Sequence, residues 1–269
     1  MEIKDLANDY EQLYALCLED WPEEVIKEAG NHRKQWYQRM KDKGVRARIA
    51  VNEEGKTQGI IQYIPIDYAP AKGEALYYIN CMRMTGNEDG QSAFRDEGTG
   101  TALLEAAEND VLELGQKGIA AQGLPMPFWM RAYWARKHGY VRTGGIGLPG
   151  EGLIWKPLAD DAVPPEPIKP RKRPERIPGR VTVTALVSGW NMSLNLAYER
   201  ARRAVEKFGR DVEFQHIDTF ERANLLEWGI SDGLFIDGMK VRFEPPPAYE
   251  KLRKILTIKV RRLQVGANF

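Results

Sequence analysis

The chain has 269 residues, with 39 Lys and Arg against 38 Asp and Glu, 43% hydrophobic residues, three His and two Cys. This composition is typical of a folded globular protein and excludes global disorder. Two cysteines cannot build a disulfide framework or a four-ligand zinc site, so we expect no metal. An acidic residue follows Met1, and no apolar run approaches the roughly 18 residues that span a bilayer. We therefore expect a soluble, cytoplasmic protein of one large or two small domains, with no membrane partner.

The first part of the chain begins with helical periodicity and then changes to strand periodicity. Apolar residues at helical spacing predict helices over residues 10–17 and from Pro22 toward Met40. Alternating apolar residues predict strands over 45–51 and 59–66. The more uniformly apolar run 75–84 predicts a third, central strand.

A glycine-containing segment follows this central strand. From Thr85 a polar stretch leads to Gly98-Thr99-Gly100, and an amphipathic helix then runs to about Gly115. The remaining predicted elements are a short strand at 119–121, a helix at 129–137, and strands at 140–141 and 153–155. Together these elements predict a mixed sheet flanked by helices over residues 1–158.

A proline-rich stretch separates this part from the rest of the chain. Residues 159–180 hold six prolines, and their second half, 169–180, carries six Lys and Arg with one Glu. Such a composition favours an extended, semi-rigid connection, so we interpret 159–180 as a linker. Its basic half could contact RNA or an acidic partner, but a solvated linker is the more common role for a short basic run.

The last part of the chain, residues 181–269, predicts a second and smaller α/β domain. Its expected elements are a strand at 181–187, a helix at 193–208, a strand at 212–217, a helix at 220–228, a hairpin at 233–243 with the turn Asp237-Gly238, and a final helix from about Pro247.

One constellation in the first domain suggests chemistry. The central strand, the segment Arg95-Asp96-Glu97-Gly98-Thr99-Gly100 and the following helix occur in that order. Glycines allow the backbone to approach a ligand closely, and the start of a helix attracts anions. The segment is neither a dinucleotide fingerprint nor a P-loop, because the third glycine and the Gly-Lys-Ser/Thr end are missing.

The Arg-x-x-Gly-x-Gly segment between a strand and a helix resembles motif A of the GNAT family of acyl-CoA-dependent N-acetyltransferases. The order of elements over about residues 1–158 also looks like that family. The segment Trp134-Ala135-Arg136-Lys137-His138-Gly139-Tyr140 is similar to the family's closing helix, which typically has an aromatic residue and Tyr, then three residues, then Gly-Phe.

The resemblance implies acetyl-CoA as the acyl donor and a small-molecule or peptide amine as the acceptor. The pyrophosphate would lie on the backbone amides from Arg95 to Thr101, and the pantetheine beside the end of the central strand. The implied cofactor-binding residues are Cys81, Met82, Arg83, Arg95, Asp96, Glu97, Gly98, Thr99, Gly100 and Thr101.

The family's usual mechanism is direct attack by an amine on the thioester, which needs a base and an acid. The position where the family carries its acid tyrosine is Ala135 in this chain. Tyr133 and His138 are the alternative candidates for the acid. Glu74 is the leading candidate for the base, with Asp67 close by in sequence, although carboxylates near loops are usually solvated.

Residues 181–269 resemble the thioredoxin-like fold in their βαβαββα order, but the first helix starts without a cysteine pair. We therefore expect this domain to bind a partner or to build a homodimer. A basic stretch near the C-terminus contains Lys251, Lys254 and Arg261. Because no aromatic residues interleave with it, we do not expect nucleic acid as a partner.

Two functions follow from these patterns. The first is an acetyl-CoA-dependent N-acetyltransferase, and it is favoured. The second is a non-catalytic acyl-CoA-binding sensor or scaffold. The missing acid and the missing redox cysteines favour this second function.

Overall fold

The computed structural model describes residues 1–6, 21–84, 97–123, 132–143 and 152–266. These residues form two compact units, each with its own core. The first unit takes the described residues within 1–19 and 40–168, and the second takes those within 20–39 and 169–269. None of the helices in these ranges is long and apolar enough to cross a membrane.

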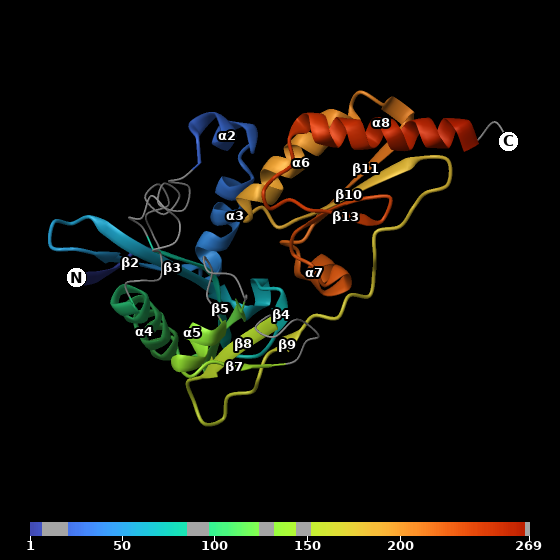
Figure 1. Ribbon diagram of the computed structural model, residues 1–269. Helices are drawn as coiled ribbons and strands as arrows, with labels where there is room; N and C mark the ends of the chain where they lie inside the picture. The colour runs from blue at the N-terminus through green and yellow to red at the C-terminus, as the bar shows by residue number, and fades with distance from the viewer. Residues whose placement is uncertain (7–20, 85–96, 124–131, 144–151, 267–269) are drawn as a thin grey trace. The chain divides into compact units, whose positions relative to one another are not determined.

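The first unit is built on a seven-stranded mixed sheet with the order β1-β2-β3-β5-β6-β8-β7 (Figure 1). Only β5 and β6 pair in parallel; the other neighbours are antiparallel. The strands are β1 (Glu2–Asp5), β2 (Arg46–Val51), β3 (Thr57–Pro65), β5 (Leu76–Met84), β6 (Gly118–Gly123), β7 (Val141–Arg142) and β8 (Gly152–Pro157). A two-stranded ladder joins β4 (Ala71–Lys72) to β9 (Glu166–Pro167), and short 3₁₀ turns lie at Lys41–Lys43 and Ile66–Tyr68.

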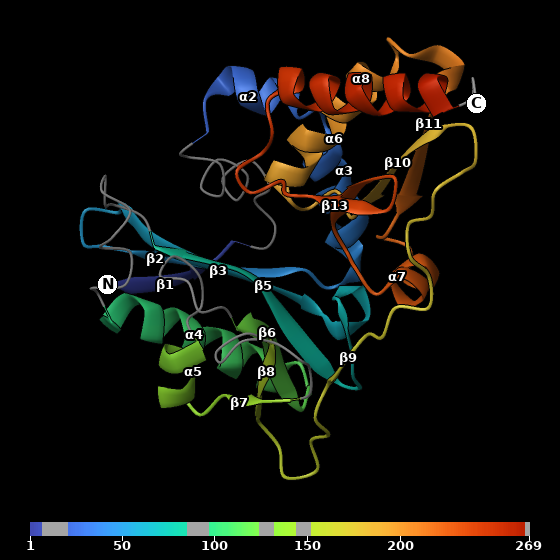
Figure 2. The ribbon, with the colours of Figure 1, turned by 45° about the vertical axis from the view of Figure 1, so that its right-hand side comes forward.

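Helices α4 (Glu97–Glu113) and α5 (Ala132–Lys137) lie on the same face of this sheet (Figure 2). The core between them and the sheet contains Leu103 and Leu104 of α4, Ala135 of α5, and Ile79 of β5. The apolar stripe of α4 falls on one side because its residues recur at helical spacing. The prediction of a mixed sheet flanked by helices is therefore confirmed.

The C-terminal half of β5 has two irregularities. The pairing of β3 with β5 shifts between Gln62, which faces Cys81, and Tyr63, which faces Ile79, so Asn80 is an extra residue in a β-bulge. The ladder between β5 and β6 ends at the pair Ile79–Ala121, although β5 continues to Met84. In the described residues β5 stays paired with β3 up to Met84, and β6 stays paired with β8 up to Gly123, so at this end the two strands separate from each other while each keeps its other neighbour.

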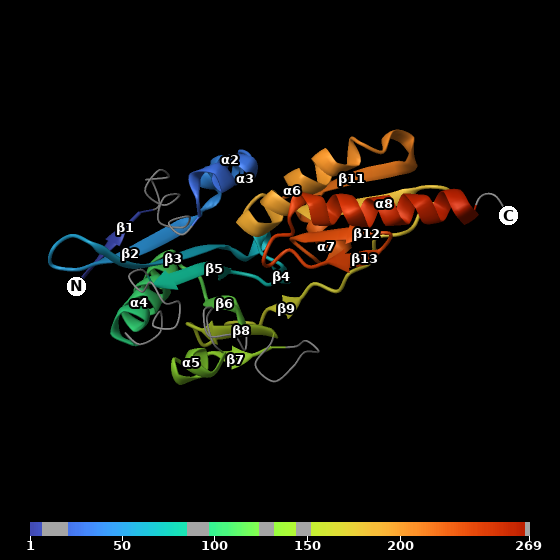
Figure 3. The ribbon, with the colours of Figure 1, turned by 45° about the horizontal axis from the view of Figure 1, so that its top comes forward.

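The second unit contains a four-stranded sheet with the order β11-β10-β12-β13 (Figure 3). Strand β10 (Val181–Val187) is parallel to β11 (Val212–Asp218) and antiparallel to β12 (Gly233–Ile236), which pairs with β13 (Met239–Val241). The helices are α2 (Glu23–Glu28), α3 (His32–Met40), α6 (Met192–Val205), α7 (Arg222–Trp228) and α8 (Tyr249–Gly266), with a 3₁₀ turn at Gly209–Asp211.

The core of the second unit lies between β10 and the pair α6 and α8. It includes Val183 of β10, Leu194 and Ala197 of α6, and Leu252 and Leu256 of α8. The predicted βαβαββα order is confirmed. Asp237 and Gly238 have φ values of 49° and 73°, so the Asp-Gly turn dipeptide makes the hairpin turn as predicted.

The predicted boundary between the domains differs from the division in the structure. Helix α2 and most of α3 cluster with the C-terminal unit, where Glu28 binds Arg200 and Arg203, and Trp36 packs on Trp190 at 4.6 Å between ring centroids. The predicted helix from Pro22 to Met40 is broken at Gly30, whose φ is 72°. Helical periodicity shows which face of a helix is apolar but not which core receives it.

Candidate functional site

The first turn of α4 and the C-terminal half of β5 come together on one face of the sheet. The glycine pattern predicted that Gly98, Thr99 and Gly100 precede the helix. In the structure they belong to the first turn of α4 instead. A Cβ atom added to Gly100 would lie 3.6 Å from Cε of Met82. The positive end of the α4 dipole therefore lies beside β5 where that strand leaves β6.

The bulge at Asn80 explains why Met82 faces α4. Tyr77 and Ile79 point into the core beneath α4, and strict alternation would place Cys81 there next. Instead Met82 joins this core, because the extra residue shifts the alternation by one. Cys81 and Arg83 are only partly buried on the same strand.

Helix α5 contributes two aromatic rings to the start of α4. Cζ2 of Trp134 would lie 3.5 Å from a Cβ atom on Gly100, and Nε2 of His138 is 3.5 Å from Oγ1 of Thr101. The rings of Trp134 and His138 pack with centroids 4.3 Å apart. Four predicted site residues, Met82, Gly100, Thr101 and His138, are thus brought together with Trp134, and the five come from three elements.

The position of the missing tyrosine is closed to substrate. Ala135 is fully buried in the core of the first unit, so no side chain from this position reaches a site. Tyr133 belongs to α5, but its side chain lies outside the described residues, as do Arg95, Asp96 and the side chain of Glu97. His138 is the one candidate acid whose surroundings are described.

Two buried amide side chains lie on the other face of the sheet at the bulge. Gln62 is 0% exposed and Asn80 is 9% exposed. None of the four polar atoms of these side chains has a hydrogen-bond partner among the described residues. An unsatisfied buried amide costs about 1–3 kcal/mol, so two neighbouring ones call for a ligand or ordered water.

A tyrosine occupies the point where β5 and β6 separate. Burial raises the pKa of the Tyr78 phenol. A hydrogen bond from the backbone of Gln122 lowers the pKa by a smaller amount. Gln122 is the first β6 residue beyond the last ladder pair, Ile79–Ala121. Neither Gln62 nor Tyr78 was a predicted site residue, although a glutamine inside the apolar run Ile60–Ile64 is an unusual choice for a core strand.

The predicted bases lie at the opposite end of β5. Glu74 is exposed two residues before the start of β5, and Asp67 is exposed just beyond the end of β3. The seven residues from Leu76 to Met82 span about 20 Å of extended strand. The structure does not bring either carboxylate to the start of α4. Among the described residues no group of three His, Cys, Asp or Glu could hold a metal ion.

No protein-family model and no curated protein matches the chain. Several solved structures resemble it. An aminoglycoside 6'-N-acetyltransferase complexed with coenzyme A is 17% identical, with 61% of this chain and 100% of that chain covered and a TM-score of 0.41. The aminoglycoside 6'-N-acetyltransferase from Enterococcus faecium is 16% identical, with 61% and 100% covered and a TM-score of 0.39. A GNAT family N-acetyltransferase from Escherichia coli in complex with CoA is 14% identical, with 60% and 82% covered and a TM-score of 0.39. These likenesses are too distant to assign a function to this chain.

Proposed function

We propose that the first unit is an acetyl-CoA-dependent N-acetyltransferase of the GNAT type that transfers the acetyl group to an amine. The observation that carries this proposal is the junction where the only parallel ladder of the sheet ends, a bulge turns Met82 toward α4, and the glycine-containing first turn of α4 begins. A helix start next to a strand separation suits a ligand with a pyrophosphate and a narrow chain attached to it.

In this proposal the pyrophosphate of the donor lies on the first turn of α4. Gly100 needs no glycine for packing, because a Cβ there meets its neighbours at 3.5 Å and 3.6 Å, which is ordinary contact. Glycine costs about 1 kcal/mol in a helix relative to alanine, so its presence supports a role outside packing. The pantetheine then continues between β5 and β6, beyond the pair Ile79–Ala121.

The reaction joins the acceptor nitrogen to the thioester carbonyl carbon. The amine attacks as a neutral nucleophile after losing a proton, and the carbonyl oxygen becomes an oxyanion that needs a hydrogen-bond donor. As the carbon–sulfur bond breaks, the CoA thiolate leaves and takes a proton. His138 is our candidate for the group that supplies this proton, because it lies at the start of α4 beside Thr101. Tyr133 is the alternative.

We propose that Gln62 and Asn80 bind the acceptor. Both amides are unsatisfied among the described residues, and both lie at the bulge on the face away from α4. Each amide can donate and accept, so the pair suits a neutral polar group such as a hydroxyl or an amide. The acceptor would therefore carry such a group near the amine that is acetylated.

The test is acetyl-CoA binding by calorimetry, followed by thiol release with a panel of amines, amino acids and polyamines. We expect Gly98→Val, at an exposed position of the first turn, to abolish binding by placing a branched side chain against the pyrophosphate. Asn109→Val, also exposed on α4, is the matched control and should bind normally. Full-strength binding by Gly98→Val would refute the placement of the donor.

The alternative is a sensor that binds acyl-CoA without turnover, which the buried Ala135 favours. Binding without thiol release for any acceptor in the panel would support the sensor. Acceptor-dependent release would support the enzyme.

We propose that the second unit has a thioredoxin-like fold without redox activity. The strand order β11-β10-β12-β13, with β10 and β11 parallel, supports this proposal. At the start of α6, Ser188 to Met192 contain no cysteine, so binding of a partner is the role left for the scaffold.

A further inference from the structure

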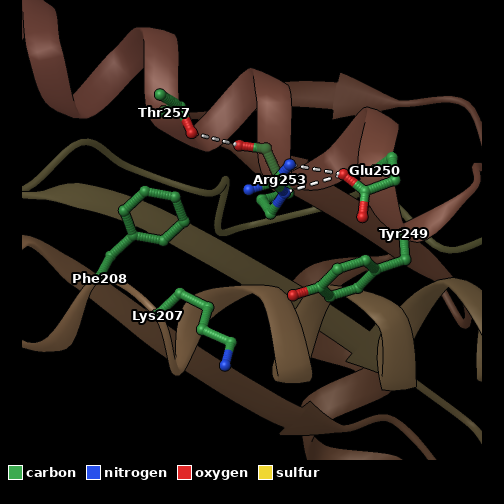
Figure 4. Close-up of a pocket in the computed structure, with 6 residues that line it drawn as sticks. All are labelled: Lys207, Phe208, Tyr249, Glu250, Arg253 and Thr257. Carbon is green, nitrogen blue, oxygen red and sulfur yellow. Dashed lines mark hydrogen bonds and ion pairs between the residues drawn. The ribbon is translucent and has the colours of Figure 1, made fainter.

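We propose that the second unit binds single-stranded nucleic acid in a groove between the end of α6 and α8. The groove has a volume of about 510 Å³ and is lined by Lys207, Phe208, Tyr249, Glu250, Arg253 and Thr257 (Figure 4). It lies wholly within the second unit and is independent of the acetyl-CoA site proposed above.

The charge of the chain is divided unevenly along its length. Residues 169–269 carry 20 Lys and Arg against 12 Asp and Glu, a net charge of +8, whereas residues 1–168 carry a net charge of −7. The near-zero net charge of the whole chain conceals this division. A concentration of positive charge in one domain is the electrostatic feature that polyanions recognise.

The groove supplies two aromatic rings, from Phe208 and Tyr249, which come from different segments of the chain. Both are partly buried, and the guanidinium of Arg203 lies 5.5 Å from the centroid of the Tyr249 ring. In the sequence no aromatic residue interleaves with the basic stretch of α8, but the fold brings Phe208 beside it. Bases of a single strand stack on such rings, whatever their sequence.

Three basic side chains of the second unit, one of them in the lining of the groove, are not neutralised by a carboxylate among the described residues. Lys207, Lys254 and Arg261 have no carboxylate partner among the described residues. Arg253 is less available, since it binds Glu250 at 2.8 Å and 2.9 Å. Arg253, Thr257 and Arg261 follow at intervals of four residues, so Arg261 continues the row that lines the groove.

This arrangement favours a strand of several nucleotides over a single nucleotide. A single phosphate is bound by one or two cations. In the second unit, basic residues continue along α8 beyond the residues that line the groove. The carboxylate of Glu250 lies in the groove, but Arg253 neutralises it. A phosphodiester chain can follow the cations while its bases reach the rings.

The experiment is fluorescence anisotropy of the full chain with labelled single-stranded RNA and DNA of about 12 nucleotides, at several salt concentrations. We expect binding whose logarithm falls linearly with the logarithm of salt, with a slope of about −2 for three phosphate contacts. Lys207→Gln/Arg261→Gln removes two of the three contacts, so it should weaken binding about tenfold and make the slope less steep by about 1.4.

Helix α8 offers a matched control. Lys251→Gln/Arg262→Gln removes the same charge from the same helix, but these residues point away from the groove by about 100° or more. This pair should change the affinity less than about threefold. Equal losses in the two pairs would refute the groove, because only net charge would then matter.

The ring is tested separately. Tyr249→Leu should weaken binding about tenfold, and Tyr249→Phe should leave it unchanged. Thermal unfolding of both variants shows whether the fold is retained. No binding at about 50 mM salt would refute the proposal. Displacement of the oligonucleotide by polyglutamate at equal charge would also refute it, because the groove would then bind any polyanion and would not select nucleic acid.

Discussion

The hydroxyl of Tyr63 donates a 2.5 Å hydrogen bond to the carboxylate of Asp110, joining strand β3 to helix α4. Arg46 and Arg48 of β2 bind the same carboxylate, and Asp110 is only 4% exposed. Burial raises the pKa of Asp110. The hydrogen bonds from Arg46 and Tyr63 and the charges of the two arginines lower it by more, so the pKa of Asp110 lies below its usual range. The contact fixes the angle of α4 on the sheet, and with it the position of the first turn.

Asp110→Asn should destabilise the first unit by about 3 kcal/mol, because it removes the charge that compensates two partly buried guanidinium groups. The protection of α4 amides against hydrogen exchange measures this loss within the unit. The wild type should also lose this stabilisation as the pH falls below about 4, because the depressed pKa makes it present only while the carboxylate is charged.

The matched control is Glu113→Gln, which removes an exposed charge from the same helix. Its effect should stay within about 0.5 kcal/mol. If the α4 amides were equally protected against hydrogen exchange in Asp110→Asn and Glu113→Gln, the contacts of Asp110 would not stabilise the first unit.

The buried amides give a prediction in which stability and affinity change in opposite directions. Gln62→Met and Asn80→Leu should each raise the stability of the ligand-free protein by about 1 kcal/mol, since they remove unsatisfied polar groups at similar volume. The same variants should raise the KM for the acceptor and leave acetyl-CoA affinity unchanged. Thermal unfolding and steady-state kinetics measure the two effects.

A neighbouring apolar residue controls for repacking. Ile64→Met on the same strand should cost less than about 1.5 kcal/mol and leave the acceptor KM unchanged. If the amide variants instead lowered stability and spared the KM, Gln62 and Asn80 would be structural groups bound to internal water.

The two candidate acids can be separated by kinetics. If His138 donates the proton, His138→Gln should lower kcat about 100-fold, while Tyr133→Phe leaves it unchanged. The affinity for acetyl-CoA should be the same in both variants. Arg136→Gln, exposed on α5, is the control. An unchanged kcat in both variants would mean that the thiolate leaves without a protein acid.

Much of the fold follows from periodicity, because strands such as β2, β5 and β10 have enough apolar residues to define a face. Three strands were not predicted. Strand β1 is mostly exposed, and β4 and β9 have two residues each, so none has an apolar pattern to recognise. Their hydrogen bonds depend on partners far away in sequence.

Only some residues of the candidate site were chosen from the sequence. The Gly-x-Gly segment and His138 were chosen because their residue types have a direct chemical meaning at a helix end, and their roles stay predictions. Gln62, which we propose as an acceptor-binding residue, was not chosen, because its position beside Asn80 depends on the bulge between β3 and β5. Glu74 was chosen for its chemistry, but its place at the other end of β5 follows only from the strand pairing.

The last prediction concerns pH. Burial raises the pKa of Asp232 to about 6, helped by the charge of Glu244 and opposed by hydrogen bonds from Ser188 and Ser231. A raised carboxyl pKa means that the folded state holds the proton more tightly, so stability falls as the pH rises from about 4 to about 7. Because Asp232 is partly exposed, the loss of stability should be about 1–2 kcal/mol.

Urea unfolding at both ends of this pH range should show the loss of stability in the wild type and not in Asp232→Asn. Glu244→Gln should reduce it, and equal pH dependence in wild type and Asp232→Asn would show that Asp232 titrates normally.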